Sequence, residues 1–343
     1  MAAAKSLKKM TAADLAKELN VSAATVSYAL NGRPGVSDRL REHIVKAALE
    51  KGIVSESDIG GPAKTRLLGL ILADIENPFY PELAVSASDF ARKIGYEVVL
   101  SHTDDKQTTV RSAVSMLVNL GVDGIILTTT QLGDAELARE MRGTHVPCTQ
   151  LSRYVEGIGG SFVGINDYEA GYEMMAHVLS HGYKKICVAA GPSVSSASAS
   201  RARGFSKAMD DAGLRIQRNL KLTTRLGYAG GVSVAEHLLS LNDKLPEVVV
   251  CGTDAIALGL IGTLARHGIN CPEDIAVTGF DGLTSAKWGT TDLTTVVQPR
   301  AKMGKTAVEQ LIHAVSDNSW KGEYSILDYS MYIGRTCGCK REG

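Results

Sequence analysis

The 343-residue sequence lacks the marks of membrane and secreted proteins. No run of about eighteen apolar residues is present, and a membrane-spanning helix needs at least that many. The first residues, MAAAKSLKK, carry charge but no apolar stretch of about seven residues or more, as a signal peptide would. These absences predict a cytoplasmic protein that does not enter a membrane.

The sequence also lacks common signatures of catalysis. No G-x-G-x-x-G motif follows an apolar run, and neither a P-loop nor a G-x-S-x-G nucleophile turn is present. The eight histidines are dispersed, and none is spaced with cysteines or acidic residues in the manner of a metal cluster. We therefore predict that the chain is not an enzyme and has no catalytic residue, cofactor or metal site.

The six cysteines are scattered along the chain. Those in the apolar runs CVAA and VVVCG are expected to be reduced and buried, as such thiols usually are. The full set is Cys148, Cys187, Cys251, Cys271, Cys337 and Cys339. Near the C-terminus, Cys337-Gly-Cys339 offers only two potential ligands, so the sequence does not favour a metal site there.

The net charge is zero, but it is unevenly distributed. Residues 1–52 hold nine lysines and arginines against five acidic residues, which leaves +4 on this segment and −4 on the remainder. With 44% hydrophobic residues, the chain can build one small and one large core. A basic small domain on a mildly acidic body is typical of a nucleic-acid-binding module joined to a body that does not itself bind DNA.

Two short amphipathic segments flank a tight turn within residues 11–31. Thr11 is placed to cap the first helix with Asp14 three residues later, and Ser22 is placed to cap the second. Asn20 tolerates the left-handed backbone that ends a helix. The residues expected to face inward are Leu15, Ala16, Leu19, Val26, Ala29 and Leu30. This pattern predicts a helix-turn-helix, although spacing alone also allows a plain helical hairpin.

The outward face of the second helix suits duplex DNA. Short hydrogen-bonding side chains that fit phosphate oxygens are Ser22, Thr25, Ser27 and Asn31. Side chains that project where base edges are met are Ala23, Ala24 and Tyr28. An alanine can pack against a thymine methyl group, and a tyrosine adds one hydroxyl. DNA is therefore the expected partner.

From Leu67 onward the pattern changes to α/β. Apolar runs without alternation predict parallel strands that are buried on both faces, at residues 67–74, 97–101, 123–129, 185–191, 247–254 and 274–281. Amphipathic segments of helical length lie between them, at residues 80–94, 109–120, 169–180, 201–212, 230–241 and 255–267. This alternation predicts a doubly wound body with room for two sheets.

Three of the predicted strands end in a carboxylate, at Asp74, Asp254 and Asp281. Ligands of open α/β sheets bind beyond the carboxyl ends of the strands, and carboxylates and arginines there can bind polyol hydroxyls. Aromatic and basic side chains that follow strand ends are Phe79, Tyr80, Trp288 and Arg201. Each aspartate taken singly could instead be a helix N-cap, so the prediction rests on their convergence.

The run VSAATVSYALNGRPGVSDRLREHIVKAALEKG, residues 21–52, resembles the DNA-binding headpiece of the lactose-repressor (LacI/GalR) family of bacterial transcription regulators. Its last part predicts a third helix that is capped by Ser37 and ends near Lys51. In that family, the residues matching Ala23, Ala24 and Tyr28 read bases. Those that hold phosphates or cap helices match Thr11, Ser22, Thr25, Ser27 and Asn31.

The resemblance extends through the body and implies a periplasmic-binding-protein-like pair of lobes crossed by three strands. The implied domains are residues 1–52 for the headpiece, 53–66 for the linker and 67–343 for the effector-binding and dimerisation domain. Lobe 1 would hold residues 67–164 and 294–320, and lobe 2 residues 165–290 and 321–338. The crossings are then expected near residues 164–167, 283–294 and 319–324.

Four motifs match the ligand loops of that family: DIENPFY at 74–80, ASRARGF at 199–205, CGTDAIALG at 251–259 and GFDG at 279–282. They imply an effector cleft, with Asp254 in a structural role. Ser152-Arg153 replaces the common Asp-Arg, and Thr253 replaces the usual Asn. The predicted cleft residues are Asp74, Phe79, Tyr80, Ser152, Arg153, Arg201, Thr253, Asp281 and Trp288. The implied effector is a sugar or sugar derivative, and Arg153 with Arg201 would admit an anionic one.

The linker departs from the family, which places a short Ala-Arg-x-Leu helix there. Gly60-Gly61-Pro62 occupies that position, and glycine and proline disfavour a helix by several kcal/mol, ~1 for each Gly and ~3 for Pro. We therefore expect no minor-groove wedge from this segment. The C-terminus lacks a leucine heptad, which favours a homodimer on a near-palindromic operator. A solute-binding protein would share the body, but the headpiece and the missing signal peptide argue against it; a sugar-metabolising enzyme is the remaining alternative.

Overall fold

The computed structural model describes residues 11–30, 35–54, 64–104, 106–129, 135–241, 245–287, 291–317 and 319–339. The chain divides into two compact units, Met1–Thr65 and Arg66–Gly343. The predicted linker is described only at residues 53–54 and 64–66, so the Gly-Gly-Pro segment lies outside the described residues. Within the described part of the chain, every helix is too short or too polar to span a lipid bilayer.

The first unit contains three helices, α1 (Ala12–Glu18), α2 (Ala23–Leu30) and α3 (Asp38–Glu50). One core joins them, with Leu15, Val26 and Ile44 fully buried at its centre. Asn20 takes the predicted left-handed backbone, with φ +54°, in the turn between α1 and α2. The apolar spacing read from the sequence therefore gives a small helical core with one helix presented outward.

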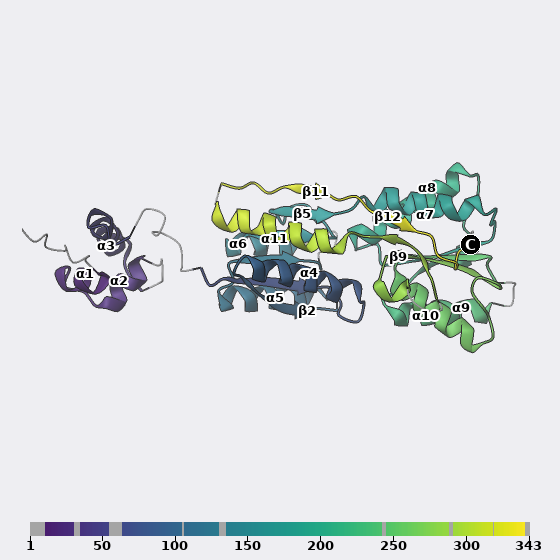
Figure 1. The fold of residues 1–343 in the computed structure, drawn as a ribbon, viewed down its shortest axis with the longest axis horizontal. Coiled ribbons are helices and arrows are strands. Elements are labelled where there is room, and N and C mark those ends of the chain that lie inside the picture. Colours follow the sequence, from purple (N-terminus) through teal and green to yellow (C-terminus); the bar gives the residue numbers. More distant parts are fainter. Residues whose placement is uncertain are drawn as a thin grey trace, which may run out of the picture. The chain divides into compact units, whose positions relative to one another are not determined.

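The second unit contains two six-stranded sheets. All strands of the first sheet are parallel, in the order β11-β5-β4-β3-β1-β2. They are β1 (Leu67–Leu72), β2 (Glu97–His102), β3 (Gly124–Leu127), β4 (Cys148–Leu151), β5 (Ser161–Gly164) and β11 (Tyr324–Ile326). Its helices are α4 (Phe79–Lys93), α5 (Gln107–Leu120), α6 (Ala135–Thr144) and α11 (Arg300–Ser316). Because α4 packs on α11 and α5 on α6, both faces of the sheet are covered (Figure 1).

The second sheet has the order β12-β10-β9-β8-β6-β7, and only β12 runs antiparallel to its neighbour. Its strands are β6 (Ile186–Ala190), β7 (Lys221–Thr223), β8 (Val248–Cys251), β9 (Ala276–Asp281), β10 (Thr294–Val297) and β12 (Ser330–Tyr332). Its helices are α7 (Asp167–Ser180), α8 (Ser196–Asp211), α9 (Tyr228–Ser240) and α10 (Asp254–Arg266). The pair α7 and α8 covers one face and the pair α9 and α10 covers the other (Figure 1).

The chain passes between the two sheets three times, and two of the predicted crossings were wrong. The first passage follows β5, as expected. The second follows β10, because Thr294–Val297 pairs with β9 in the second sheet instead of belonging to lobe 1. The third follows β11, because Tyr324–Ile326 pairs with β5 in the first sheet instead of belonging to lobe 2. Which sheet a short strand joins is decided by distant partners, and residue spacing along the chain carries no information on it.

The helices α7 and α8 approach each other closely at two glycines. A Cβ on Gly204 would lie 2.1 Å from the carbonyl oxygen of Tyr168, and one on Gly171 would lie 2.6 Å from that of Arg201. No side chain fits at either position without moving the backbone of the other helix. This contact holds the start of α8 against the start of α7, where the side chains of the candidate site begin.

Candidate functional site

The second helix of the headpiece has a buried and an exposed face, as its sequence predicts. Val26, Ala29 and Leu30 are buried, whereas Ala23, Ala24 and Ser27 are exposed. Tyr28 is exposed over 40% of its surface, unusual for a large aromatic residue in a small domain. An exposed row of small residues beside one tyrosine can approach the edges of bases without steric hindrance.

The residues placed at the helix starts do cap them. Thr11 and Asp14 form a capping box, in which the Asp14 N–H donates to Thr11 Oγ1 at 3.3 Å and the Thr11 N–H donates to Asp14 Oδ2 at 3.0 Å. Ser22 Oγ accepts from the Thr25 N–H at 3.0 Å and lies 2.8 Å from Thr25 Oγ1. Ser37 precedes α3 but makes no such bond, so its predicted side-chain cap was wrong. Asn31 lies outside the described residues.

Seven of the nine predicted cleft residues line one cavity, which lies between the two lobes at the carboxyl ends of their strands. They are Phe79, Tyr80, Ser152, Arg153, Arg201, Thr253 and Asp281. The free space inside the cavity is only about 20 Å³, which is room for about one water molecule. All seven side chains are buried. In this arrangement of the lobes the cavity is too small for a sugar, so a ligand of that size enters only if the lobes move apart.

Arg201 is the central cation of the second-lobe wall. Its Nε donates to Asp167 Oδ1 at 2.7 Å, and its Nη1 donates to the Gly252 carbonyl at 2.8 Å and lies 3.4 Å from Asp281 Oδ1. The guanidinium also stacks on Phe280, 3.7 Å from the ring centroid. Burial alone would lower the pKa of Arg201, but the two carboxylates outweigh it and raise the pKa. The arginine thus remains charged inside a closed site.

Asp281 has an acceptor atom that the described residues do not satisfy. Oδ1 accepts from Gln298 Nε2 at 2.8 Å, whereas Oδ2 is buried with no hydrogen-bond partner among the described residues. Its backbone φ of +123° is strained for a residue with a side chain. Burial raises the pKa of Asp281, and Arg201 offsets this only in part. A buried carboxyl oxygen without a protein partner is satisfied by a water molecule or by a polar group of a ligand.

Two polar residues next to Asp281, Asp254 and Thr253, form hydrogen bonds within the protein. Asp254 accepts from Thr295 Oγ1 at 2.5 Å and from the Leu283 N–H at 2.6 Å, which is the structural role expected of it. Thr253 lines the cavity but also caps α10, because its Oγ1 accepts from the Ile256 N–H at 3.2 Å.

Two of the nine predicted cleft residues are not among those that line this cavity. Asp74 lines a neighbouring pocket, and Trp288 lies outside the described residues.

The cavity has further lining residues that the sequence analysis did not select: Asn77, Ser195, Ala197, Ser198 and Leu226. Asn77 lies within the DIENPFY motif, and the two serines belong to the serine-rich loop before Arg201. The motif and the loop could therefore have indicated these three lining residues from the sequence. Asn77 Nδ2 donates to the Leu226 carbonyl at 3.1 Å, which joins the two lobes across the cavity. A second bond between the lobes runs from the Tyr154 N–H to Ser196 Oγ at 2.9 Å.

Tyr80 and Arg153 form the first-lobe wall. Arg153 Nη2 donates to Tyr80 Oη at 2.7 Å, and Phe79 packs edge-to-face against the Tyr80 ring at 5.2 Å. The cavity thus has an aromatic side, two arginines and one unsatisfied carboxylate oxygen. Such a set can hold a ligand that combines an apolar face with several hydroxyl groups.

Both units match known families. Residues 11–52 match the model for bacterial regulatory proteins of the lacI family. Residues 65–333 match the model for periplasmic binding proteins and the sugar binding domain of the LacI family. The chain belongs to the LacI family of transcriptional regulators. Its headpiece binds DNA and its body has the periplasmic-binding-protein architecture, so a solute-binding protein without a DNA role is no longer an alternative.

Several relatives of this LacI-family chain are curated regulators. The HTH-type transcriptional regulator DegA of Bacillus subtilis is 31% identical over 86% of this chain and 88% of DegA. Catabolite control protein A of Priestia megaterium is 30% identical over 88% of this chain and 91% of its own length. The HTH-type transcriptional repressor PurR of Glaesserella parasuis is 28% identical over 90% of this chain and 91% of its own length. These relatives are transcription regulators and not enzymes.

Solved structures show the same fold. A complex of the transcriptional regulator CelR with cellobiose aligns with a TM-score of 0.72 at 23% identity and covers 95% of this chain and 99% of its own. A LacI-family regulator from Enterococcus faecium with bound ribose aligns with a TM-score of 0.69 at 24% identity, over 79% of this chain and 98% of its own.

Proposed function

We propose that this regulator is a repressor and that its effector is a sugar or sugar derivative, bound in the cavity between the lobes when they have moved apart to admit it. The observation that carries the proposal is the buried, unsatisfied Oδ2 of Asp281. A sugar hydroxyl supplies the donor that this oxygen lacks, and Arg153 and Arg201 supply donors for further hydroxyls or for an anionic group. The rings of Phe79 and Tyr80 suit the apolar face of a sugar ring.

Comparison with relatives supports this choice of ligand class. Structures of the same fold hold cellobiose or ribose. Arg201 is already paired with Asp167 and Asp281, so Arg153 is the buried cation that favours a sugar acid or sugar phosphate over a neutral sugar.

For the DNA-binding side, we propose a cytoplasmic homodimer whose headpieces enter successive major grooves of a near-palindromic operator. In each headpiece, the side chains that contact base edges are those of Ala23, Ala24 and Tyr28. The phosphates are contacted by Thr25, Ser27 and Asn31. Thr11 and Ser22 position their helices through the caps and reach the backbone of the DNA. Effector binding closes the lobes and alters operator affinity, and by linkage operator binding alters effector affinity by the same factor.

A thermal-shift screen tests the effector class. Wild-type protein is heated with a panel of sugars, sugar acids and sugar phosphates. A true effector at about 100 times its dissociation constant stabilises the fold by about 2.7 kcal/mol. Asp281→Asn keeps the shape of the side chain but replaces one acceptor with a donor, so it should lose most of the shift. Arg203→Ala, on the same helix as Arg201 but outside the cavity lining, is the matched control and should keep the shift.

Two outcomes contradict the proposal. The first is a panel in which no sugar derivative raises the unfolding midpoint of the wild-type protein. The second is an active ligand whose shift is the same in wild-type and Asp281→Asn protein, because that ligand would bind elsewhere.

A further inference from the structure

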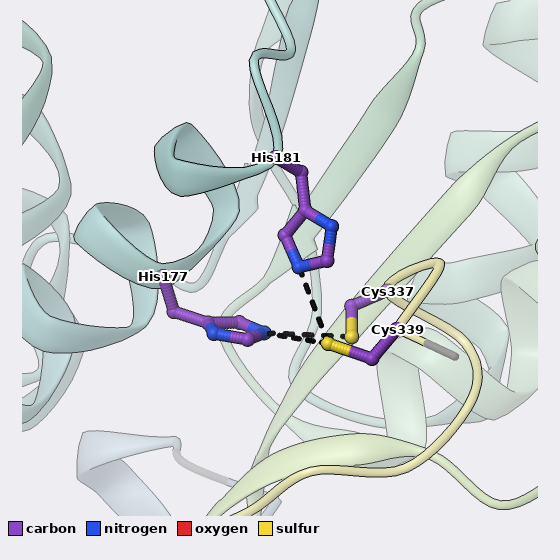
Figure 2. Close-up of side chains that lie close together, drawn as sticks. All are labelled: His177, His181, Cys337 and Cys339. Carbon is purple, nitrogen blue, oxygen red and sulfur yellow. Dashed lines mark hydrogen bonds between the residues drawn. The ribbon is translucent and has the colours of Figure 1, made fainter. Parts of the chain in front are cut away.

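The second lobe contains a cluster of two histidines and two cysteines, far from the cavity. His177 lies in the last turn of α7, and His181 follows directly after that helix. Cys337 and Cys339 lie in the C-terminal segment that follows β12. Figure 2 shows the four side chains converging on one point, with both ring nitrogens directed at the sulfur atoms. The four potential ligand atoms all lie within 4.8 Å of one another.

Three of the six separations between these atoms lie close to the edges of a tetrahedral zinc site. His181 Nε2 lies 3.3 Å from Cys339 Sγ, and His177 Nε2 lies 3.4 Å from Cys337 Sγ and 3.9 Å from Cys339 Sγ. With zinc–sulfur bonds of about 2.3 Å and zinc–nitrogen bonds of about 2.0 Å, a regular tetrahedron has edges of about 3.3 to 3.8 Å. Since all six separations are at most 4.8 Å, shifts of about 1 Å or less would bring the four atoms around one metal ion.

The local sequence on both sides suits chelation. His177 and His181 are four residues apart, which places both on one face of the helix end, as in helical zinc motifs. Between the cysteines, Gly338 has φ +88°, a conformation that permits both sulfur atoms to turn to the same side. A Cβ on Gly338 would also lie 2.7 Å from the Tyr183 hydroxyl. Glycine is thus the residue that this cysteine pair requires.

Surrounding groups hold the cluster in place. Tyr183 stacks on the ring of His181 at 5.6 Å, and its hydroxyl donates to the Cys337 carbonyl at 3.0 Å. Thr294 Oγ1 donates to Cys337 Sγ at 3.0 Å, which is a contact that stabilises a metal-bound thiolate. Cys337 is fully buried. The sulfur atoms are therefore oriented before any metal arrives.

We propose that His177, His181, Cys337 and Cys339 form a structural zinc site that fastens the C-terminal segment to the end of α7. Two thiolates and two imidazoles in tetrahedral array select zinc among the common biological metals. Four protein ligands leave no open position, so the site stabilises structure and does not activate water. Binding of Zn²⁺ releases the two thiol protons to solvent and forms two Zn–S and two Zn–N bonds, with no redox change.

The site is separate from the effector cavity. Asp167, which binds Arg201, begins α7, whereas His177 and His181 lie at its other end, about 15 and 20 Å away at about 1.5 Å per helical residue. The zinc-bound segment follows directly after β12, the edge strand of the second sheet. Zinc therefore secures the last strand of this lobe, and its loss should loosen that edge.

Metal content of the purified full-length protein tests the proposal. The protein is produced with zinc in the medium, passed over a gel-filtration column without chelator, and analysed by mass spectrometry for metals. Wild type should retain about one zinc per chain, the stoichiometry of a closed four-ligand site. Cys339→Ala and His181→Ala should each retain less than about a tenth of that amount, since two or three ligands bind zinc far more weakly. Cys271→Ser and His267→Ala, which alter a cysteine and a histidine outside the cluster, should retain the full amount.

A second measurement separates zinc binding from misfolding. Cobalt added to metal-free wild type should give the absorption bands of tetrahedral thiolate-bound Co²⁺, and these bands should be lost in Cys339→Ala. Chelator should lower the unfolding midpoint of wild type to that of Cys339→Ala and leave the variant unchanged. The proposal is overturned if wild type holds no zinc and gives no cobalt bands, if zinc content is the same in all variants, or if Cys337 and Cys339 are found as a disulfide.

Discussion

Arg300, at the start of α11, forms a salt bridge with Glu82 of α4 at 2.9 Å, and its guanidinium also donates to the backbone of the other lobe. Nη2 donates to the Gly282 carbonyl at 2.9 Å, and Nη1 donates to the carbonyl of Asp281. Arg300 also marks the passage of the chain from the second sheet back to the first lobe. One side chain thus joins a first-lobe helix to the strand end that carries the unsatisfied carboxylate.

Removing the contacts that Arg300 makes between the lobes should favour an arrangement in which the lobes are open. Arg300→Met keeps the length of the side chain but loses the charge-assisted bonds, each worth about 1.5–3 kcal/mol. We expect effector affinity to fall by about tenfold or more, measured by calorimetry with the ligand found in the screen. Lys302→Met, an exposed neighbour on the same helix, should leave affinity unchanged. Equal effector affinity in Arg300→Met and wild type would show that the Arg300 contacts do not contribute to closure of the lobes.

Asp254 should make stability depend on pH between about 4 and 6. Burial raises its pKa to about 6, against about 3.9 in an unfolded chain. Between these values the folded state binds more protons than the unfolded state, so the contribution of Asp254 to stability falls as pH rises. In urea unfolding, the stability of wild type should therefore fall relative to that of Asp254→Asn as pH rises over this range. Asp210→Asn, which alters an exposed aspartate, should show no such change.

Two glycine-to-alanine substitutions should have opposite signs. In Gly204→Ala the new methyl group would lie 2.1 Å from the Tyr168 carbonyl, and overpacking of this kind costs about 1–3 kcal/mol. In Gly262→Ala, on α10, the methyl group meets no atom within 4 Å, so the gain in helix propensity of about 1 kcal/mol should appear as stabilisation. Denaturant unfolding measures both. If Gly204→Ala is as stable as wild type, the helices α7 and α8 are free to move apart.

Tyr28 should contribute to sequence preference more than to the salt dependence of DNA binding. A base-reading side chain contributes about 1–3 kcal/mol of discrimination, whereas each neutralised phosphate adds about −0.9 to the slope of log affinity against log salt. Tyr28→Ala should therefore flatten the preference between operator variants with an unchanged slope in a fluorescence-anisotropy titration. Ser27→Ala is the control for a phosphate contact and should weaken all duplexes alike. An equal loss on all sequences in Tyr28→Ala would remove Tyr28 from base reading.

Much of the architecture was predictable because it depends on local patterns. The six apolar runs became β1, β2, β3, β6, β8 and β9. Five of these strands are buried as predicted, but β2 lies at a sheet edge without a buried residue, so burial on both faces was wrong for the run at 97–101. The sequence did not indicate β7, β11 and β12, which have three residues each and also lie at sheet edges. Such a short, half-exposed strand leaves little apolar signal. Its existence is decided by the partner strand that it meets.

The candidate sites also differ in whether local sequence or contacts between distant residues create them. Strand ends and family motifs indicated the cavity lining, because each motif is a short continuous segment. The sequence analysis weighed Cys337 and Cys339 and did not favour a metal site, because His177 and Cys337 are 160 residues apart and only the packing of the C-terminal segment against α7 brings the proposed ligands together. Each cysteine pair or histidine pair alone is too common to predict a ligand set.

The late position of β11 and β12 has a consequence for biosynthesis. Each sheet receives its last edge strand from residues 324–332, so neither lobe is complete until these residues have left the ribosome. The headpiece, by contrast, is continuous in sequence and can fold while the body is still being translated. A ribosome that stalls or terminates early would therefore release a chain with a folded headpiece and an incomplete body, which would neither respond to metabolite nor form the dimer that we propose for operator binding.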